Sequence, residues 1–541
     1  QILTGNPVKL PDISSGKNTL SFNFLMEEAE VFRLVRAGSF DEALRKLQKE
    51  PILWTAREEG NHSLLHWAAL FGDADFVTEA LKQIEVDARA QNLQTPLMWA
   101  MTRGHVQAAK VLLEAKADPF AQDSVGASPL ILAVQHYHVN AILLLFALCP
   151  AGPLLATRDT RGCNVVSWAA YKGDMPSLQL LAYFDADFTV VDDEKMTPLH
   201  RAAQGQHDQV YSFLLDRGVD PSVVDVNGRT CLDVLEQVNK TSRSVRAMKR
   251  LLEHQPSKDP EMGKVLSRRR NSEESERFAK RVRRMAPATF WLCCVSVACF
   301  EYLTELQAIA WQLTPQCAQA FEFGVPLCLL IFLAAANMDP GKVPSRIKGN
   351  SGVEEVLRGL AKPGDAEVPE AKRLCTATFV IKDLRTKYCK ESQACIKEFD
   401  HFCGWLGTAI GQGNHRTFML LVVVELTVQW LHFAMCVIFL RKAVTKDTFF
   451  EYISHTVMQY PFMVFVMMLH FFSSPGIAFL LANHLYLVGV NMTTNEMVNC
   501  YRYEHFWQVT NGRKVFKNPF HKGILMNCME FWWYQDRSSL A

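Results

Sequence analysis

The four-residue stretch from Asp400 to Cys403 (Asp-His-Phe-Cys) brings a carboxyl group, an imidazole and a thiol together in a short length of chain. The thiolate is the nucleophilic form of cysteine, but an ordinary cysteine is mostly protonated at neutral pH. A neighbouring imidazole can remove the thiol proton, and a carboxylate can orient that imidazole. The pattern therefore predicts nucleophilic catalysis, with Cys403 as the nucleophile, His401 as the base and Asp400 as the orienting group.

The surrounding segment, LCTATFVIKDLRTKYCKESQACIKEFDHFCGWLGTAIGQGNHRTF, resembles the cysteine-rich domain of the DHHC family of protein S-acyltransferases. Three accessory motifs of that family follow in the expected order along the chain. They are Asp339-Pro340-Gly341, the TTxE motif at Thr493, Thr494 and Glu496, and an NPFxxGxxxN motif at Asn518, Pro519, Phe520, Gly523 and Asn527. Together with the repeats described below, the resemblance indicates the ankyrin-bearing branch, animal huntingtin-interacting and fungal.

This resemblance implies a protein S-acyltransferase (palmitoyltransferase) that works in two steps. Acyl-CoA, with palmitoyl-CoA as the preferred donor, would load Cys403, and a client cysteine would then take the acyl group. The TTxE residues and Asn527 would support the catalytic core, and no cofactor is expected beside the acyl donor. The alternative hypothesis is a catalytically inactive DHHC-like membrane scaffold that recruits clients, in which Cys403 is inert.

Members of the family bind two structural zinc ions through sets of three cysteines and one histidine, and the matching positions here have lost most ligands. The first set would be Cys375, Thr378, Tyr388 and Cys395, and the second Cys389, Ser392, Phe402 and Ala409. A structural zinc ion needs about four nitrogen or sulfur ligands. The sequence therefore predicts no bound metal. By resemblance, some fungal ankyrin-bearing members also have a loop that has lost zinc ligands, and this favours an active enzyme. Gly404 stands where the family has a proline, and this favours the inactive alternative.

Four apolar segments, at about residues 286–304, 316–338, 417–440 and 462–490, must place this loop at a membrane. Each can cross a hydrocarbon layer of ~30 Å, which needs about 20 residues. Glu301 and Glu322 lie near the ends of the first two, and His470 and His484 in the last are expected to be packed polar groups. Basic residues before the first segment and in the loop 342–402 predict that both termini and this loop face the cytosol. The resemblance implies Golgi or related endomembranes, and no selectivity-filter sequence supports a channel.

A repeat of about 33 residues, the ankyrin period, fills the first half of the chain. Its units begin at Ser63, Thr95, Ser128, Asn164, Thr197 and Thr230. Stacked helix pairs bury a continuous core and usually bind another protein. By resemblance, Trp99 matches an aromatic residue that docks client peptides, although the asparagine expected in the preceding repeat is missing. Packing within the repeat explains Trp99 equally well, so both interpretations stay open.

The fold class that follows is all-α: an ankyrin-repeat solenoid, then a polytopic helical membrane domain with a cytosolic DHHC-type loop. A net charge of +1 gives no reason to expect nucleic acid, and 15 scattered cysteines suggest reduced thiols. The expected partners are acyl-CoA, membrane lipid and cytosolic or membrane-associated clients. The expected domains are a cap region at 1–60, ankyrin repeats at 61–255, a basic linker at 256–285, transmembrane helices at 286–338 and 417–490, the catalytic loop at 339–416 and a C-terminal region at 491–541.

Overall fold

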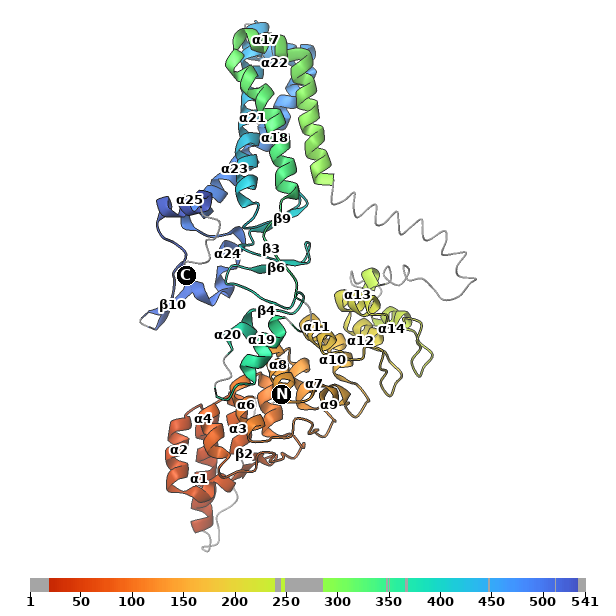
Figure 1. The fold of residues 1–541 in the computed structure, drawn as a ribbon, viewed down its shortest axis with the longest axis vertical. Helices are drawn as coiled ribbons and strands as arrows, with labels where there is room; N and C mark the ends of the chain where they lie inside the picture. Colours follow the sequence, from red (N-terminus) through yellow and green to blue (C-terminus); the bar gives the residue numbers. More distant parts are fainter. Residues whose placement is uncertain are drawn as a thin grey trace. The chain divides into compact units, whose positions relative to one another are not determined.

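The computed structural model describes residues 19–533, except 239–244, 249–285, 347–348, 350, 365–367, 446–447 and 511. The expected basic linker therefore lies outside the described residues. The chain divides into two compact units, one of Gln1–Gln255 with Lys348–Lys372 and the other of Pro256–Ile347 with Arg373–Ala541. The expected fold class is confirmed, because a helical repeat array precedes four long apolar helices (Figure 1). Short strands, which the sequence did not indicate, shape the loop between the second and third of these helices.

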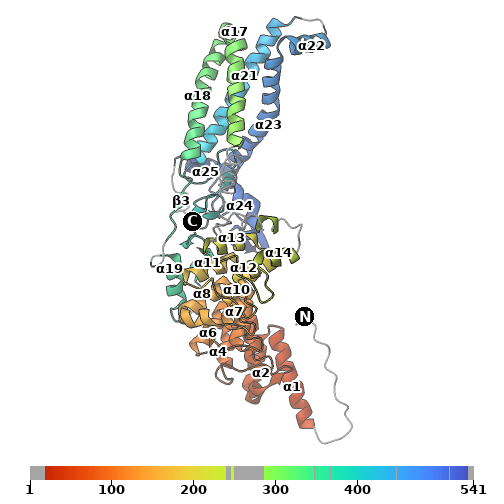
Figure 2. The ribbon, with the colours of Figure 1, turned by 90° about the vertical axis from the view of Figure 1, so that its right-hand side faces the viewer.

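The first unit is a stack of short helix pairs, and its turns follow from the repeat sequence. Thr95 caps α5 by accepting a hydrogen bond from the Met98 N–H at 3.4 Å, Pro96 opens the helix, and Gly104 ends it in the left-handed conformation with φ 73°. The first helices of successive repeats pack on one another, for example α3 on α5 and α5 on α7. Figure 2 shows the helices of the repeats following one another along the first unit. The elements are α1 (Thr19–Arg36), α2 (Phe40–Lys49), η1 (Pro51–Thr55), β1 (Arg57–Glu58), β2 (His62–Ser63), α3 (Leu64–Phe71), α4 (Ala74–Ala80), α5 (Pro96–Arg103), α6 (Val106–Glu114), α7 (Pro129–Gln135), α8 (Val139–Leu148), α9 (Ala151–Ala156), α10 (Val165–Lys172), α11 (Met175–Tyr183), α12 (Pro198–Gly205), α13 (Asp208–Asp216) and α14 (Cys231–Val238).

A segment from the second half of the sequence belongs to this first unit. Helix α19 (Gly352–Leu360) packs against α8 with Val353, Val356 and Leu360 buried. The hydroxyl of Tyr183 lies 2.8 Å from that of Ser351 and donates to the Glu354 carboxylate. The loop between the second and third apolar helices is therefore attached to the repeat array through its own early part.

Four helices of the second unit are long and apolar enough to cross a membrane. They are Ala286–Leu313, α18 (Pro315–Asn337), α21 (His415–Ala443) and α23 (Pro461–Val490), with the shorter α22 (Phe449–Gln459) before the last. The first contains a π-helical turn at Tyr302–Leu306 and continues through α17 (Gln307–Leu313). It runs to Leu313 and not to residue 304, so Glu301 lies inside this span and is fully buried.

Short strands and turns build the parts of this unit on either side of the spans. The loop contains β3 (Lys342–Val343), α20 (Pro369–Arg373), β4 (Leu374–Cys375), β5 (Val380–Ile381), β6 (Lys387–Cys389), β7 (Ala394–Ile396), β8 (His401–Cys403) and β9 (Thr408–Ile410). Strands β3, β7 and β6 form one sheet in that order, whereas β4–β5 and β8–β9 form hairpins. The C-terminal region contains α24 (Thr494–Asn499), η3 (Cys500–Arg502), η4 (Glu504–Phe506), β10 (Trp507–Thr510), β11 (Arg513–Phe516) and α25 (Ile524–Trp533).

Candidate active site

The β8–β9 hairpin brings the imidazole and the thiol together. Alternate side chains of a strand point to the same face, so His401 and Cys403 share one face and Phe402 takes the other. The antiparallel register pairs Phe402 with Ala409, and the Gly407 N–H donates to the Cys403 carbonyl at 2.9 Å to close the turn. The side chain of Cys403 is hydrogen-bonded to that of His401. A spacing of two residues thus places a base beside the thiol.

The Asp400 carboxylate is buried and bonded at both oxygens. The His401 Nδ1–H donates to its Oδ2 at 2.7 Å, and the Thr494 backbone N–H donates to its Oδ1 at 2.7 Å. Burial raises the pKa of Asp400, but the charge of His415 and the hydrogen bond from His401 outweigh burial and hold this pKa well below its usual range. Asp400 therefore stays ionised and fixes the orientation of the imidazole.

His401 is held in its protonated form by the groups on both sides of it. Burial lowers its pKa, but the hydrogen bonds to Asp400 and Cys403 outweigh burial and raise the pKa to about 9. An imidazolium beside the thiol stabilises a thiolate. The three residues that the sequence predicted as catalytic are therefore brought together in an arrangement that can generate a nucleophile.

The thiol of Cys403 lies in an apolar cluster that continues into the spans. Cys403 is 7% exposed and packs with Ile331, Phe332 and Ala335 of α18 and with Phe418 and Leu421 of α21. Partly buried side chains of the first and last spans, Trp291 and Ile477, complete this cluster. The reactive sulfur therefore sits where the apolar interior of the helix bundle meets the polar loop.

The TTxE motif forms a cap that supports Asp400. The Thr493 side chain accepts from the Glu496 N–H at 3.1 Å, and Glu496 Oε2 accepts from the Thr493 N–H at 2.8 Å. This capping box begins α24, and its first N–H groups reach Asp400: Thr494 binds the side chain and Asn495 binds the carbonyl at 3.1 Å. The motif therefore positions the orienting carboxylate.

Arg385 is a site residue that the sequence reasoning missed. Its guanidinium makes two 2.8 Å hydrogen bonds to the Glu496 carboxylate and a 3.0 Å bond to Asn491, and it lies over the Phe520 ring at 4.6 Å. Both members of the Arg385–Glu496 pair are buried, with side chains 2% and 4% exposed. No local pattern marks this arginine in the sequence, because its partners all lie after the end of α23, more than a hundred positions further along the chain.

The C-terminal NPFxxGxxxN motif closes the end of α23. The Asn518 side chain donates to the Val490 carbonyl at 2.6 Å, and the Asn527 side chain donates to the Gly489 carbonyl at 2.6 Å. These are carbonyls at the end of the helix, which have no partner within it. Asn527 therefore binds the end of α23, which the TTxE segment follows directly in the chain.

The Asp339-Pro340-Gly341 motif packs directly against the segment after β9. The Asp339 carboxylate accepts from the N–H groups of Gly341 at 3.0 Å and Lys342 at 2.9 Å. A Cβ on Gly413 would lie 2.1 Å from the Asp339 carbonyl oxygen, so only glycine fits this close approach. Asn414 donates to the Ala409 carbonyl at 2.9 Å and fixes the end of the hairpin.

Two further histidines lie beside the catalytic residues. Ligand atoms of His484, His401 and Asp400 lie within 4.8 Å of one another, and the His415 and His484 rings are hydrogen-bonded at 3.5 Å. His484 is therefore a packed polar group at the site, on the last span. A metal ion has no free carboxylate oxygen here, because both Asp400 oxygens are already bonded.

The positions that match the family's zinc ligands hold few ligand side chains in this chain, and several of them pack in apolar surroundings. Cys389, Phe402 and Ala409 of the second set pack together with Ile396 in one apolar cluster. In the first set, Cys375 is hydrogen-bonded to Cys395, which lies 3.3 Å from the Thr378 hydroxyl. Two thiols and a hydroxyl are too few strong ligands for structural zinc.

Trp99 is part of an aromatic cluster in the first repeats. Its indole N–H donates to Gln94 at 2.9 Å, and its ring centroid lies 4.8 Å from that of His62 and 5.4 Å from that of Trp67. Trp99 is only 9% exposed, whereas Phe71, stacked on Trp67, is 43% exposed. Packing therefore accounts for most of the Trp99 ring, and Phe71 offers the larger exposed surface.

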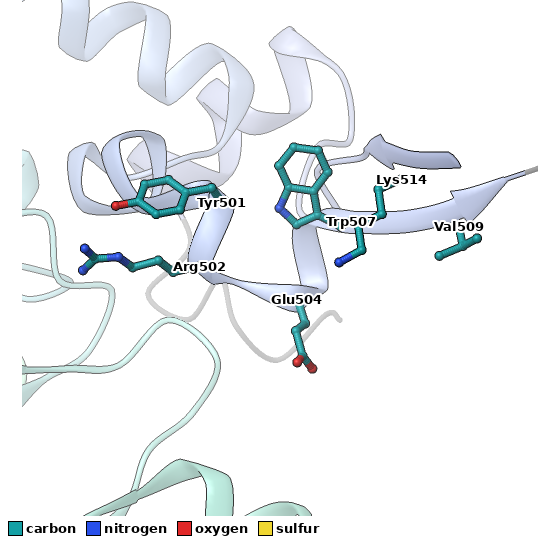
Figure 3. A pocket seen from close by; sticks show the side chains of 6 residues that line it. All are labelled: Tyr501, Arg502, Glu504, Trp507, Val509 and Lys514. Atoms are coloured by element: carbon teal, nitrogen blue, oxygen red, sulfur yellow. The ribbon is translucent and has the colours of Figure 1, made fainter. Parts of the chain in front are cut away.

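A surface pocket in the C-terminal region lies apart from these residues. Figure 3 shows its lining side chains, none of which belongs to the motifs: Tyr501, Arg502, Glu504, Trp507, Val509 and Lys514. It is therefore not part of the catalytic arrangement.

The family models and the sequence relatives agree with this architecture. Residues 368–501 match the DHHC palmitoyltransferase family, and ankyrin repeats match residues 65–159, 135–225 and 166–261. Palmitoyltransferase AKR1 of Lachancea kluyveri is 25% identical over 71% of this chain, which spans 58% of that relative. Palmitoyltransferase ZDHHC17 of Danio rerio is 26% identical over 88% of this chain and 82% of its own length. The human ASB11 ankyrin repeat domain matches 42% of this chain and 99% of its own, with 23% identity and a TM-score of 0.37.

Proposed function

The chain belongs to the DHHC palmitoyltransferases that carry ankyrin repeats, and from this premise we propose that it transfers a fatty acyl group from acyl-CoA to client cysteines through a thioester on Cys403. One observation carries the assignment of the residues. The Cys403 thiol is hydrogen-bonded to an imidazole that Asp400 orients, at the edge of an apolar cluster. The other cysteines of the loop, Cys375, Cys389 and Cys395, have no histidine among their hydrogen-bond partners within the described residues.

In the first step, the proton of the Cys403 thiol already rests on His401, which its neighbours hold in the protonated form, and the Cys403 thiolate attacks the thioester carbonyl of acyl-CoA. The new carbon–sulfur bond forms as the bond to the CoA sulfur breaks. The leaving CoA thiolate takes the proton from the His401 imidazolium, so the imidazole is neutral again. Asp400 keeps the ring in place and stabilises its positive charge between these two transfers.

In the second step, the client cysteine takes the place of CoA. His401 accepts the proton of the client thiol, the client sulfur attacks the Cys403 thioester, and the bond to Cys403 breaks. The Cys403 thiolate then recovers the proton from His401. One base therefore serves both steps, since in each step it holds the proton of the attacking thiol and returns it to the leaving thiolate.

The apolar cluster around Cys403 supports a long acyl chain as the group transferred. Side chains of α18 and α21 surround the sulfur, so an acyl chain attached to Cys403 extends among the spans and not into water. Burial of apolar chain is worth about 0.8 kcal/mol for each CH₂ group. We therefore propose palmitoyl-CoA as the acyl donor.

The cysteine-rich loop of this enzyme works without structural zinc. The apolar packing of Cys389, Phe402 and Ala409, the hairpin hydrogen bonds and the TTxE cap support this part of the proposal. The location that goes with it is a Golgi-type endomembrane, with both termini and the loop in the cytosol. That placement follows from family resemblance and from the basic residues around the spans.

Client proteins dock on the repeat array before transfer. The aromatic cluster of Trp67, Phe71 and Trp99 supports this step, because it exposes Phe71 beside two tryptophans. Substitution Trp99→Ala is expected to weaken client acylation while the acyl-enzyme still forms. The matched change Trp168→Ala, in a later repeat, is expected to weaken client acylation far less.

The experiment that tests the activity measures an acyl-enzyme on the purified full chain. Labelled palmitoyl-CoA is added, and the label should appear on the protein and leave with hydroxylamine. Cys403→Ser should abolish the label, whereas Cys500→Ser, a matched change outside the site, should retain it. No label on the unmodified chain, or equal label on Cys403→Ser, would reject the proposal and favour a non-catalytic scaffold.

A further inference from the structure

Three of the four spans meet at a group of polar side chains that takes no part in the mechanism above. Glu301 comes from the first span, His432 and Cys436 come from α21, and His470 comes from α23. Glu301, His432 and Cys436 are each 0% exposed. Their ligand atoms, a carboxylate oxygen, a ring nitrogen and Sγ, all lie within 4.8 Å of one another.

This cluster contains an unsatisfied group. His432 Nε2 lies 2.7 Å from Glu301 Oε2, but Glu301 Oε1 is buried with no hydrogen-bond partner among the described residues. A carboxylate inside the apolar part of a span is costly unless it is paired or coordinates a metal. A π-helical turn begins directly after Glu301, and such turns often mark functional sites.

We propose that Glu301, His432 and Cys436 bind a divalent transition-metal ion of the zinc class, which joins the first and third spans. Carboxylate oxygen, imidazole nitrogen and cysteine sulfur are all zinc ligands. With water as the fourth ligand, a dication also neutralises the carboxylate of Glu301 and the thiolate of Cys436, so the cluster has no net charge when the ion is bound. Charge balance matters here because the surroundings are apolar.

His470 supplies the hydrogen-bond partner that a metal-binding histidine usually has at its other ring nitrogen. Its Nε2 lies 2.8 Å from Nδ1 of His432, on the opposite side of the ring from Glu301. When His432 binds the ion through Nε2, its Nδ1–H donates to His470, which fixes the tautomer and the ring. The ion displaces the proton of the Cys436 thiol and the proton between His432 and Glu301.

The fourth position of a tetrahedral ion is left for Glu305 or for water. Glu305 lies four residues after Glu301, and its Oε2 is also buried without a hydrogen-bond partner in the described structure. Its charge acts on both Glu301 and Cys436. The group at the active site, Asp400 with His401 and His484, differs from this one because its carboxylate oxygens are already bonded.

The test measures metal on the full chain, purified in detergent without chelators or a metal-affinity step. Mass spectrometry should find about one zinc per chain, and Cys436→Ser and Glu301→Gln should lose it. Two controls should keep it: Cys328→Ser, a span cysteine outside the cluster, and the double change Cys375→Ser with Cys395→Ser in the loop. Circular dichroism verifies that each variant is folded.

Cobalt(II) exchanged for zinc gives a second measurement, which detects a metal–thiolate bond in the unmodified chain itself. The unmodified chain and the double loop variant should both show the near-ultraviolet charge-transfer absorption of a cobalt–thiolate bond. Cys436→Ser, where it folds, should lack this absorption. A chain that takes up no zinc on reloading, a Cys436→Ser variant with full zinc, or loss of zinc and absorption in the loop variant would each overturn the proposal.

Discussion

Asp400→Asn is the change that tests the catalytic arrangement most directly. An asparagine keeps an oxygen for the Thr494 N–H, but its amide group offers a donor to His401 Nδ1 where the carboxylate accepted one. The ring must then carry its proton on Nε2, toward Cys403, and it can no longer take the thiol proton. In a Ser-His-Asp triad, this wrong tautomer costs about 10⁴ in rate, and we expect a loss of about 10²–10⁴ in acyl-enzyme formation.

The structure also gives the pH dependence of this loss. The hydrogen bonds to Asp400 and Cys403 raise the pKa of His401 from its usual value near 6.5 to about 9. Because this pKa is raised, the imidazolium is present at neutral pH and is lost only as the pH passes about 9. The rate should therefore fall on the alkaline side near pH 9, and in Asp400→Asn this fall should move toward lower pH.

The assay is the single-turnover rate of acyl-enzyme formation from labelled acyl-CoA, measured between pH 6 and about 10, a range that brackets the His401 pKa. Asp383→Asn, an exposed carboxylate of the same loop, is the control and should keep the rate and its pH profile. An Asp400→Asn enzyme with a normal rate, or with an alkaline limit that does not move, would refute the reasoning that Asp400 orients and charges His401.

Three other changes test the surroundings of the site. Arg385→Ala leaves the buried Glu496 carboxylate unpaired and should reduce stability by about 3–5 kcal/mol, which is measured as a lower Tm in detergent. Arg502→Ala, a change of an exposed arginine, should leave the Tm unchanged. An equal Tm for the two variants would contradict the importance of the buried pair. Gly413→Ala places a methyl group 2.1 Å from a backbone oxygen and should abolish acyl-enzyme formation, whereas Gly404→Ala has open space within 4 Å and should retain it. Phe402→Ala removes one of the two phenylalanine rings packed on the apolar cluster and should cost about 3 kcal/mol of stability, near the low end for such a change because the ring is only half-buried. An unchanged Tm would show that packing does not replace the zinc.

The part of the site that could be predicted from the sequence is the part that is contiguous in the chain. Asp400 directly precedes β8, which contains both His401 and Cys403, and a spacing of two is the period of a strand. The TTxE cap follows similar local rules, because Thr493 and Glu496 form a capping box within a single turn. The repeat helices were also predictable, since caps, prolines and glycines recur at a fixed period.

The rest depends on contacts between residues far apart in the sequence. Arg385 and Glu496 pair although 111 positions separate them in the sequence, and Glu301 and His432 pair across a separation of 131 positions. An isolated arginine or glutamate has no local pattern that names its partner. Similarly, α19 lies in the sequence between two spans, yet it packs on the repeat helix α8, which only the folded chain reveals.

The cluster of Cys389, Ile396, Phe402 and Ala409 changes what the loop depends on. A domain that needs a bound metal ion is stable only when the cell supplies that ion, and its stability rises with the concentration of the ion. A domain held by hydrocarbon contact is free of that supply, but its cohesion weakens in the cold, because the hydrophobic effect declines with falling temperature. From this packing we expect the stability of the loop around Cys403 to fall in the cold and not to depend on the supply of zinc.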